Sequence, residues 1–185
     1  DFCLSRGLGD VYKRQAENNE LNACRGSVRN QCMVAAKSPQ GFFTLRVPTG
    51  GGKTLSVVGF ALAHAKRHGL QRIVIALPYT NLIEQTADVL RDVFGAQNVL
   101  EHHSNYDFEA VDPERAQHEK LATQNWDAPI IVTTNVQLFE SLFSNKPGKS
   151  RKVHNIAKSV LVLDEAQSLP DLSLIHISEP TRQAE

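Results

Sequence analysis

Three consecutive glycines followed by a lysine and a threonine constrain the fold of this chain more than any other feature. The segment TGGGKT, Thr49 to Thr54, comes after the apolar run GFFTLRVP and before TLSVVGFALAHAKRHG, in which apolar residues recur at helical spacing. Glycines let the backbone approach an anion closely, and the N–H groups at a helix N-terminus bind anions with help from the helix dipole. The order of strand, glycine loop and helix therefore predicts a nucleotide phosphate site in an α/β fold.

The side chains of this loop have separate expected roles. The Lys53 ammonium reaches the β- and γ-phosphates of a nucleotide, and the Thr54 hydroxyl is placed to bind Mg²⁺. The sequence thus predicts ATP and Mg²⁺ as cofactors, with the nucleotide held by Thr49, Gly50, Gly51, Gly52, Lys53 and Thr54.

The rest of the chain alternates short apolar runs with helical patterns. After the expected strand that begins at Gly41, three further strands are expected at Arg72–Pro78, Pro129–Thr134 and Ser159–Glu165. Their continuous apolarity indicates burial on both faces, so the pattern predicts a mostly parallel sheet with helices on both faces. An apolar share of 41% in 185 residues suits one well-buried domain. The expected helices include one whose apolar face is the series Leu82, Thr86, Val89 and Val93.

Two adjacent carboxylates, Asp164 and Glu165, end the last of these strands. The carboxyl end of a parallel strand faces the same crevice as the phosphate loop, so Asp164 is expected to hold hydrated Mg²⁺. Glu165 is expected to orient and deprotonate the attacking water. A strand followed by Asp-Glu is by itself weak evidence for a catalytic site. The GGGKT segment upstream in the same domain favours the catalytic interpretation.

Together these segments resemble superfamily 2 helicases of the DExD/H type, with TGGGKT as motif I and DEAQ as motif II. The resemblance is closest to the helicase portion of the CRISPR-associated helicase–nuclease of type I systems. It rests on these runs, in this order: PTGGGKT, LPYTNLIEQTA, EHHSN, NWDAPIIVTTNVQLFESLF, HNIAKSV and LDEAQSLP.

This resemblance implies a RecA-like P-loop NTPase lobe, joined in the whole protein by a second RecA-like lobe and an HD nuclease domain. It also implies single-stranded DNA and a CRISPR surveillance complex as partners. Gln167 stands where many relatives have His or Asp and is suited to link the nucleotide site to the second lobe. Gln31 could read the adenine edge as a Q-motif does, or it could be an unremarkable exposed helix residue.

Two polar clusters at strand ends match the nucleic-acid motifs of this family by resemblance. Their hydroxyls, amides and helix N-termini would meet the phosphates of a single strand, in contacts that carry little sequence information. Ordinary capping of the next helix by Thr80 or Asn135 is the alternative, and both can hold. The residues are Pro78, Tyr79 and Thr80 in the first cluster and Thr133, Thr134, Asn135 and Gln137 in the second.

The adjacent histidines His102 and His103 suggest a metal site. Neighbouring residues on one element point apart, however, and no carboxylate at ligand spacing is evident. A surface or DNA-proximal loop is therefore the preferred interpretation of this pair.

The two ends of the chain are related through their DNA. With suitable codons for Asp1–Gln15, the reverse complement of that DNA encodes LSLIHISEPTRQAE, which is Leu172–Glu185. Both ends thus resemble one transposase-inserted sequencing adapter read on opposite strands. We expect 1–15 and 172–185 to be non-native, and 16–171 to be the helicase ATP-binding lobe from a partial gene.

The expected function is therefore ATP-driven translocation along single-stranded DNA in type I CRISPR interference. Another superfamily 2 motor, such as a restriction translocase or an RNA helicase, and a non-translocating nucleotide switch remain as alternatives. The formal charge of zero gives no polyanion signal. The sequence has three cysteines without zinc-like spacing, and it shows no signal peptide and no long apolar span. These features favour a location in the cytoplasm, and we expect no membrane among the partners.

Overall fold

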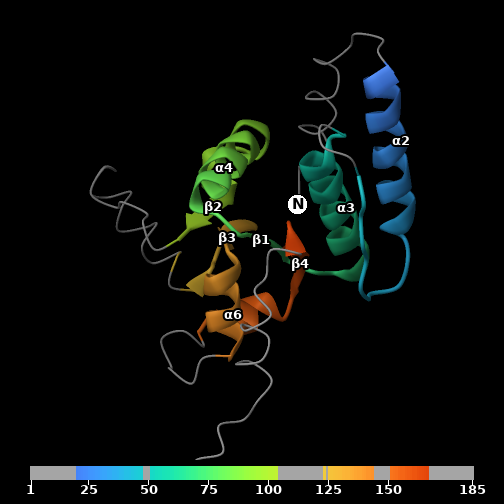
Figure 1. Cartoon of the computed structure of the whole chain (residues 1–185). Coiled ribbons are helices and arrows are strands. Elements are labelled where there is room, and N and C mark those ends of the chain that lie inside the picture. Colours follow the sequence, from blue (N-terminus) through green and yellow to red (C-terminus); the bar gives the residue numbers. More distant parts are fainter. Residues whose placement is uncertain (1–19, 48–50, 104–122, 124, 144–150, 167–185) are drawn as a thin grey trace, which may run out of the picture.

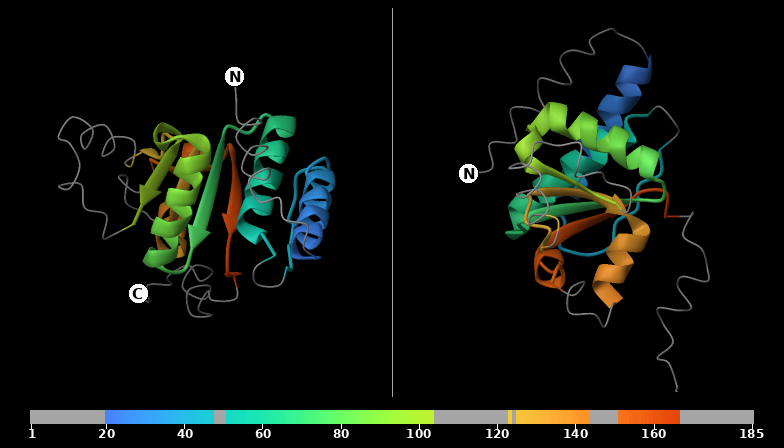
Figure 2. Two further views of the ribbon diagram at one scale, coloured as in Figure 1. Left: turned by 90° about the horizontal axis from the view of Figure 1, so that it is seen from above. Right: turned by 90° about the vertical axis from the view of Figure 1, so that its left-hand side faces the viewer.

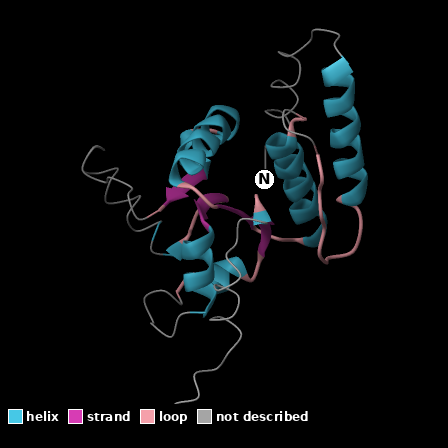
Figure 3. Ribbon diagram, in the orientation of Figure 1, coloured by secondary structure: helices cyan, strands magenta, loops and turns pink. Residues whose placement is uncertain are grey.

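The computed structural model describes residues 20–47, 51–103, 123, 125–143 and 151–166. Within this part of the chain, four parallel strands form one sheet with the spatial order β2-β3-β1-β4 (Figures 1 and 3). The expected α/β fold with a parallel sheet is confirmed. The strands are β1 (Arg72–Leu77), β2 (Val99–His102), β3 (Ile130–Thr134) and β4 (Ser159–Leu163).

Helices cover both faces of this sheet. Helices α3 and α4 cover one face, and α6 and α8 cover the other (Figure 2). Apolar side chains of each pair of helices belong to the core cluster on their own face. An additional helix, α2, packs on the outer side of α3 (Figure 1). The elements are α2 (Glu20–Ala35), α3 (Lys53–His68), α4 (Thr80–Phe94), the 3₁₀ turn η1 (Ala96–Asn98), α6 (Asn135–Phe143) and α8 (Val153–Ile156).

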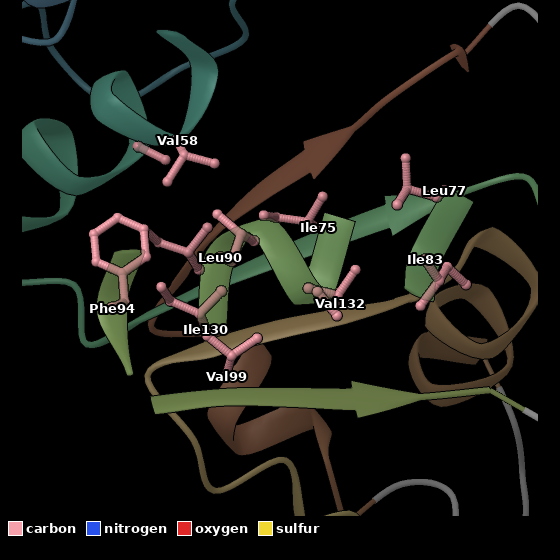
Figure 4. Close-up of a cluster of buried hydrophobic side chains, with 12 residues drawn as sticks. Val58, Ile75, Leu77, Ile83, Leu90, Phe94, Val99, Ile130 and Val132 are labelled. Carbon is pink, nitrogen blue, oxygen red and sulfur yellow. The ribbon is translucent and has the colours of Figure 1, made fainter. Parts of the chain in front are cut away.

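Strand β1 runs through the middle of the core. Its side chains alternate between the two faces, so Ile73, Ile75 and Leu77 join the cluster under α3 and α4 (Figure 4), while Val74 and Ala76 join the opposite cluster. Burying an Ile or Leu side chain stabilises the fold by about 1.5–3 kcal/mol. Both faces of β1 carry apolar side chains, so burial alone does not determine which side chains point toward α3 and α4. The fit of the side chains against their neighbours must determine this.

The strand register places the carboxyl ends of the strands at one edge of the sheet. Leu77 of β1 lies opposite Thr134 of β3, and Ala76 lies opposite Leu163 of β4. The N–H of Asp164 continues this pairing by donating to the carbonyl of Ala76 at 3.0 Å. The residues that follow β1, β3 and β4 therefore share one edge, which is where ligands bind in parallel sheets.

The run that begins at Gly41 is not a strand, contrary to expectation. Residues 42–47 carry no strand pairing, and the Phe42 and Leu45 side chains are exposed. An extended run becomes a strand only when a neighbouring strand completes its hydrogen bonds, and within the described residues β4 pairs on one side only. Phe43 instead packs edge-on against Phe60 of α3, with ring centroids 4.9 Å apart.

The helix expected after β1 is present, but its buried face differs from the expected series by one position. The buried residues of α4 are Ile83, Ala87, Leu90 and Phe94, whereas Val89 is exposed. The two series have the same spacing, so periodicity predicts the helix and cannot choose between neighbouring stripes.

Strand β2 was not expected from the sequence, because four residues that include Glu101 and His102 give no apolar run.

None of the described helices combines the length and the apolarity that crossing a bilayer requires.

Candidate functional site

The site is built where α3 begins. Gly52 precedes the helix with φ 72° and ψ 29°, a left-handed conformation that favours glycine. A Cβ atom added at Gly52 would also lie 3.3 Å from Cγ of Arg25, a residue of α2. The Gly52 carbonyl accepts the Ser56 N–H at 3.1 Å and so starts the helix. Gly52 is therefore needed for its backbone conformation, and its lack of a Cβ atom leaves room for the Arg25 side chain.

Lys53, the first residue of α3, contacts both carboxylates that follow β4. Its Nζ atom lies 2.7 Å from Oδ1 of Asp164 and 2.8 Å from Oε1 of Glu165. Hydrogen bonds from Lys53 to Asp164 and to Glu165 raise the lysine pKa, so this side chain is firmly protonated. The fold thus brings together three residues that the sequence predicted for one site, although 112 positions separate Lys53 from Glu165.

A sharp turn allows adjacent carboxylates to reach one cation. Successive side chains on a strand point to opposite faces, but Glu165 has a positive φ of 52° and the strand ends before it, at Leu163. The Glu165 N–H donates to Oδ1 of Asp164 at 2.9 Å and stabilises this turn. Positive φ is uncommon outside glycine and costs free energy, so the surrounding contacts must hold Glu165 in this conformation.

The arrangement of these residues suits the binding of a nucleotide together with Mg²⁺. Helix α3 directs its first N–H groups toward the space before Gly52, and a cation and two carboxylates lie beside that helix end. Thr54 lies in the first turn, next to Lys53, and is partly exposed. Carboxylate and hydroxyl oxygens are ligands that Mg²⁺ prefers.

Other expected nucleotide residues are placed differently. Thr49, Gly50 and Gln167 lie outside the described residues. Gln31 is exposed on α2, and no hydrogen bond in the described part of the chain ties it to the phosphate loop. Sequence reasoning instead missed Arg25, whose side chain contacts the position of Gly52 from α2. No local pattern marks Arg25, because its closeness to the loop depends on how α2 packs against α3.

The two expected nucleic-acid clusters lie side by side, because they follow the paired strands β1 and β3. Tyr79 is 61% exposed and Thr80 begins α4, whereas Asn135 is buried. The alternative that Thr80 or Asn135 caps the next helix is wrong for both residues. Helix α4 has no side-chain cap, and at the start of α6 it is the Thr134 hydroxyl that accepts the Gln137 N–H, at 3.0 Å. Pro78, Tyr79 and Thr80 are consequently the more accessible cluster.

The preferred interpretation of the two histidines as a surface loop is wrong. His102 ends β2 and accepts the indole N–H of the fully buried Trp126 at 3.1 Å. Burial, with a smaller effect from the Lys152 charge, lowers the His102 pKa to about 3. His103 is buried too, and its Nε2 atom lies 2.9 Å from Oε1 of Glu101. The two rings therefore contact different partners, Trp126 and Glu101.

Comparisons with known proteins agree with this geometry. A family model described as DEAD/DEAH box helicase matches residues 27–179. The chain is also similar to a protein of Haloferax volcanii called CRISPR-associated nuclease/helicase Cas3, with 29% identity over 150 residues. That match covers 69% of this chain and 16% of the Haloferax protein.

Proposed function

Because the chain belongs to the DEAD/DEAH box helicase family, we propose that it is the ATP-binding lobe of an ATP-dependent translocase on single-stranded DNA. The name of the similar Haloferax protein supports a role in CRISPR interference, which we place in type I systems. The chain spans only 16% of that protein, so the activity and partners of the whole protein are part of the proposal.

The observation that carries the proposal is the contact of Lys53 with Asp164 and Glu165. A lysine at a helix N-terminus beside two strand-end carboxylates is the arrangement that phosphoryl transfer needs. A structural ion pair would need one carboxylate, whereas here the chain adopts an uncommon backbone conformation at Glu165 that brings in the second.

Each residue then has one role. Gly51 and Gly52 let the backbone surround the phosphates, and Lys53 pairs with the β- and γ-phosphate oxygens. Thr54 and Asp164 would hold Mg²⁺, which neutralises charge on the phosphate oxygens when bound. Glu165 orients a water molecule and accepts its proton, and we assign Gln167 to relaying the nucleotide state toward a second lobe.

The nucleic-acid strand is proposed to cross the sheet edge over Pro78, Tyr79 and Thr80. These residues adjoin the nucleotide site because β1 pairs directly with β4, the strand that ends at the carboxylates. The exposed Tyr79 ring offers a surface on which a base can stack, an interaction worth about 1–3 kcal/mol. Thr134, Asn135 and Gln137 would complete the contact from β3 and α6.

The proposal requires partners that complete the motor. We expect a second RecA-like lobe to supply an arginine to the γ-phosphate, and an HD nuclease domain and a CRISPR surveillance complex to act with it. An arginine of this kind contributes roughly 10³ to 10⁵ in rate. The chain alone should therefore bind ATP with Mg²⁺ and hydrolyse it very slowly.

The test is to measure ATP binding and phosphate release by the purified chain, with Mg²⁺ and with or without a long single strand. We expect saturable ATP binding and turnover far below one per second, unchanged by DNA. Turnover stimulated by DNA above about one per second, within the range of complete enzymes, would contradict the proposed need for a second lobe. Lack of ATP binding would contradict the nucleotide site itself.

A further inference from the structure

A second cluster of possible ligand atoms lies beside β2, which is at the opposite end of the strand order from β4 and the nucleotide site. We propose that Glu84, Glu101 and His103 bind a divalent metal ion of the zinc class. One ligand atom from each of these residues lies within 4.8 Å of the others. This proposal does not depend on the proposed function, because none of the three residues belongs to the nucleotide or nucleic-acid site.

The fold explains why the three residues converge. Glu101 lies in β2 and His103 follows two positions later, so the two side chains leave the backbone on the same side. Helix α4 packs against β2 and carries Glu84 on its second turn. The sequence distance between Glu84 and the other two residues hides this cluster from any local pattern.

Burial and charge favour a cation at this position. Glu101 and His103 are both 5% exposed, and a buried carboxylate is stable only when it is paired or bound to metal. Arg91 pairs with Oε2 of Glu101 at 2.8 Å and also with Asp88 at 3.1 Å. Glu101 therefore shares Arg91 with the exposed Asp88 and has His103 as its other partner, and a divalent ion beside Oε1 would meet both this carboxylate and the imidazole.

The contact with Arg91 also orients the ligand. Because Oε2 of Glu101 is bound by the guanidinium, Oε1 is directed toward His103. Metal-binding carboxylates are commonly fixed in this way by an outer hydrogen bond. Glu84 is exposed, so it can move to the metal as a third ligand and leaves the site open to solvent.

The distances and atom types select the class of metal. Two ligand atoms on one tetrahedral zinc ion lie roughly 3.4 Å apart, given metal–ligand bonds of about 2.1 Å. Nε2 of His103 and Oε1 of Glu101 are 2.9 Å apart, so a small opening admits the ion. An imidazole with two carboxylates suits zinc, manganese or iron, whereas Ca²⁺ takes six or more oxygen ligands.

The alternative explanation for the closeness of Glu101 and His103 is a buried hydrogen bond without a metal ion. It differs from metal binding in the residues that it requires. That hydrogen bond needs only Glu101 and His103, whereas metal binding also needs the exposed Glu84. Replacing Glu84 therefore separates the two explanations without disturbing the buried pair.

The experiment is calorimetric titration of ZnCl₂ into the full 185-residue chain, freed of metal by chelation and carrying Cys24→Ser to remove an exposed thiol. We expect one zinc ion per chain with a Kd of about 10 µM or tighter. Glu84→Gln should weaken binding at least tenfold, and His103→Ala should do the same. Circular dichroism before each titration shows whether the variant is folded, and Glu84→Gln, at an exposed position, keeps the test valid if His103→Ala unfolds.

Two matched controls exclude other sites. Asp92→Asn removes an exposed carboxylate from the same helix, and His68→Ala removes one member of the His64–His68 pair, whose ring centroids are 4.3 Å apart. Neither control should change zinc affinity. Binding that is weaker than about 10 µM in the parent chain, that survives Glu84→Gln, or that is lost with His68→Ala overturns the proposal.

Discussion

Replacing Glu165 by glutamine should strengthen ATP binding while it abolishes most hydrolysis. The Lys53 ammonium contacts both Asp164 and Glu165, at 2.7 and 2.8 Å. The phosphates of ATP must take Lys53 away from these carboxylates. Glu165→Gln keeps the shape of the side chain and removes one of the two competing charges, whereas Lys53→Ala removes the cation itself.

The size of the gain follows from the exposure of this ion pair. The Lys53 and Glu165 side chains are 32% and 41% exposed, so solvent screens their attraction. Pairs of this kind contribute about 0.2–1 kcal/mol, and losing one competitor should raise ATP affinity by about 1.4- to 5-fold. Lys53→Ala loses a charge-assisted contact with phosphate of about 1.5–3 kcal/mol, so affinity should fall by about 10- to 150-fold.

The assay is equilibrium titration of a fluorescent ATP analogue with Mg²⁺ into the wild-type chain and both variants, at low and moderate salt. The gain for Glu165→Gln should shrink as salt screens the competing contact. In the proposed two-lobed protein, the same substitution should lower the hydrolysis rate by about 10² or more, because it removes the general base that we assign to Glu165. Asp92→Asn, an exposed change on α4, serves as the control for charge removal.

Two results would refute this reasoning. If Glu165→Gln weakened ATP binding as much as Lys53→Ala, Glu165 would be a nucleotide ligand rather than a competitor for Lys53. If hydrolysis in the intact protein were unchanged by Glu165→Gln, the assignment of Glu165 as the base would be wrong.

Three further predictions concern stability and the chain ends. His102 has a pKa of about 3 in the folded chain, against an ordinary value of 6.5. The unfolded chain therefore binds a proton first as the pH falls, so the free energy of unfolding should be highest above pH 6.5 and should decrease toward pH 3. Urea unfolding at pH 5 should show a loss of roughly 2 kcal/mol that a His102→Gln chain lacks. Leu90→Ala, at a fully buried position, should lower the free energy of unfolding by about 2–5 kcal/mol, whereas Val89→Ala, at an exposed one, should change it by less than about 0.5 kcal/mol. Removing 1–15 and 172–185 should leave the Kd for ATP within about tenfold, measured by the same titration; a larger loss would show that these ends contribute to the nucleotide site.

Much of the fold could be predicted from sequence because strands and helices are encoded locally. The apolar runs around Ile75, Val132 and Val162 predicted three parallel strands, and the spacing of apolar residues predicted α3 and α4. The failures also have local causes. Strand β2 is too short and too polar to produce a pattern, and the run after Gly41 has strand composition without a described strand beside it.

Within the candidate site, the sequence determined which chemistry is present, and the tertiary structure decided which residues meet. Glycines before a lysine, and paired acids after an apolar run, are local signals because each depends on the backbone of a few neighbouring residues. The contacts of Lys53 with Asp164 and Glu165, of Arg25 with the Gly52 position, and of Glu84 with the cluster at His103 depend on strand order and helix packing. Those distances arise from burial of apolar surface summed over the whole core, which no short stretch of sequence contains.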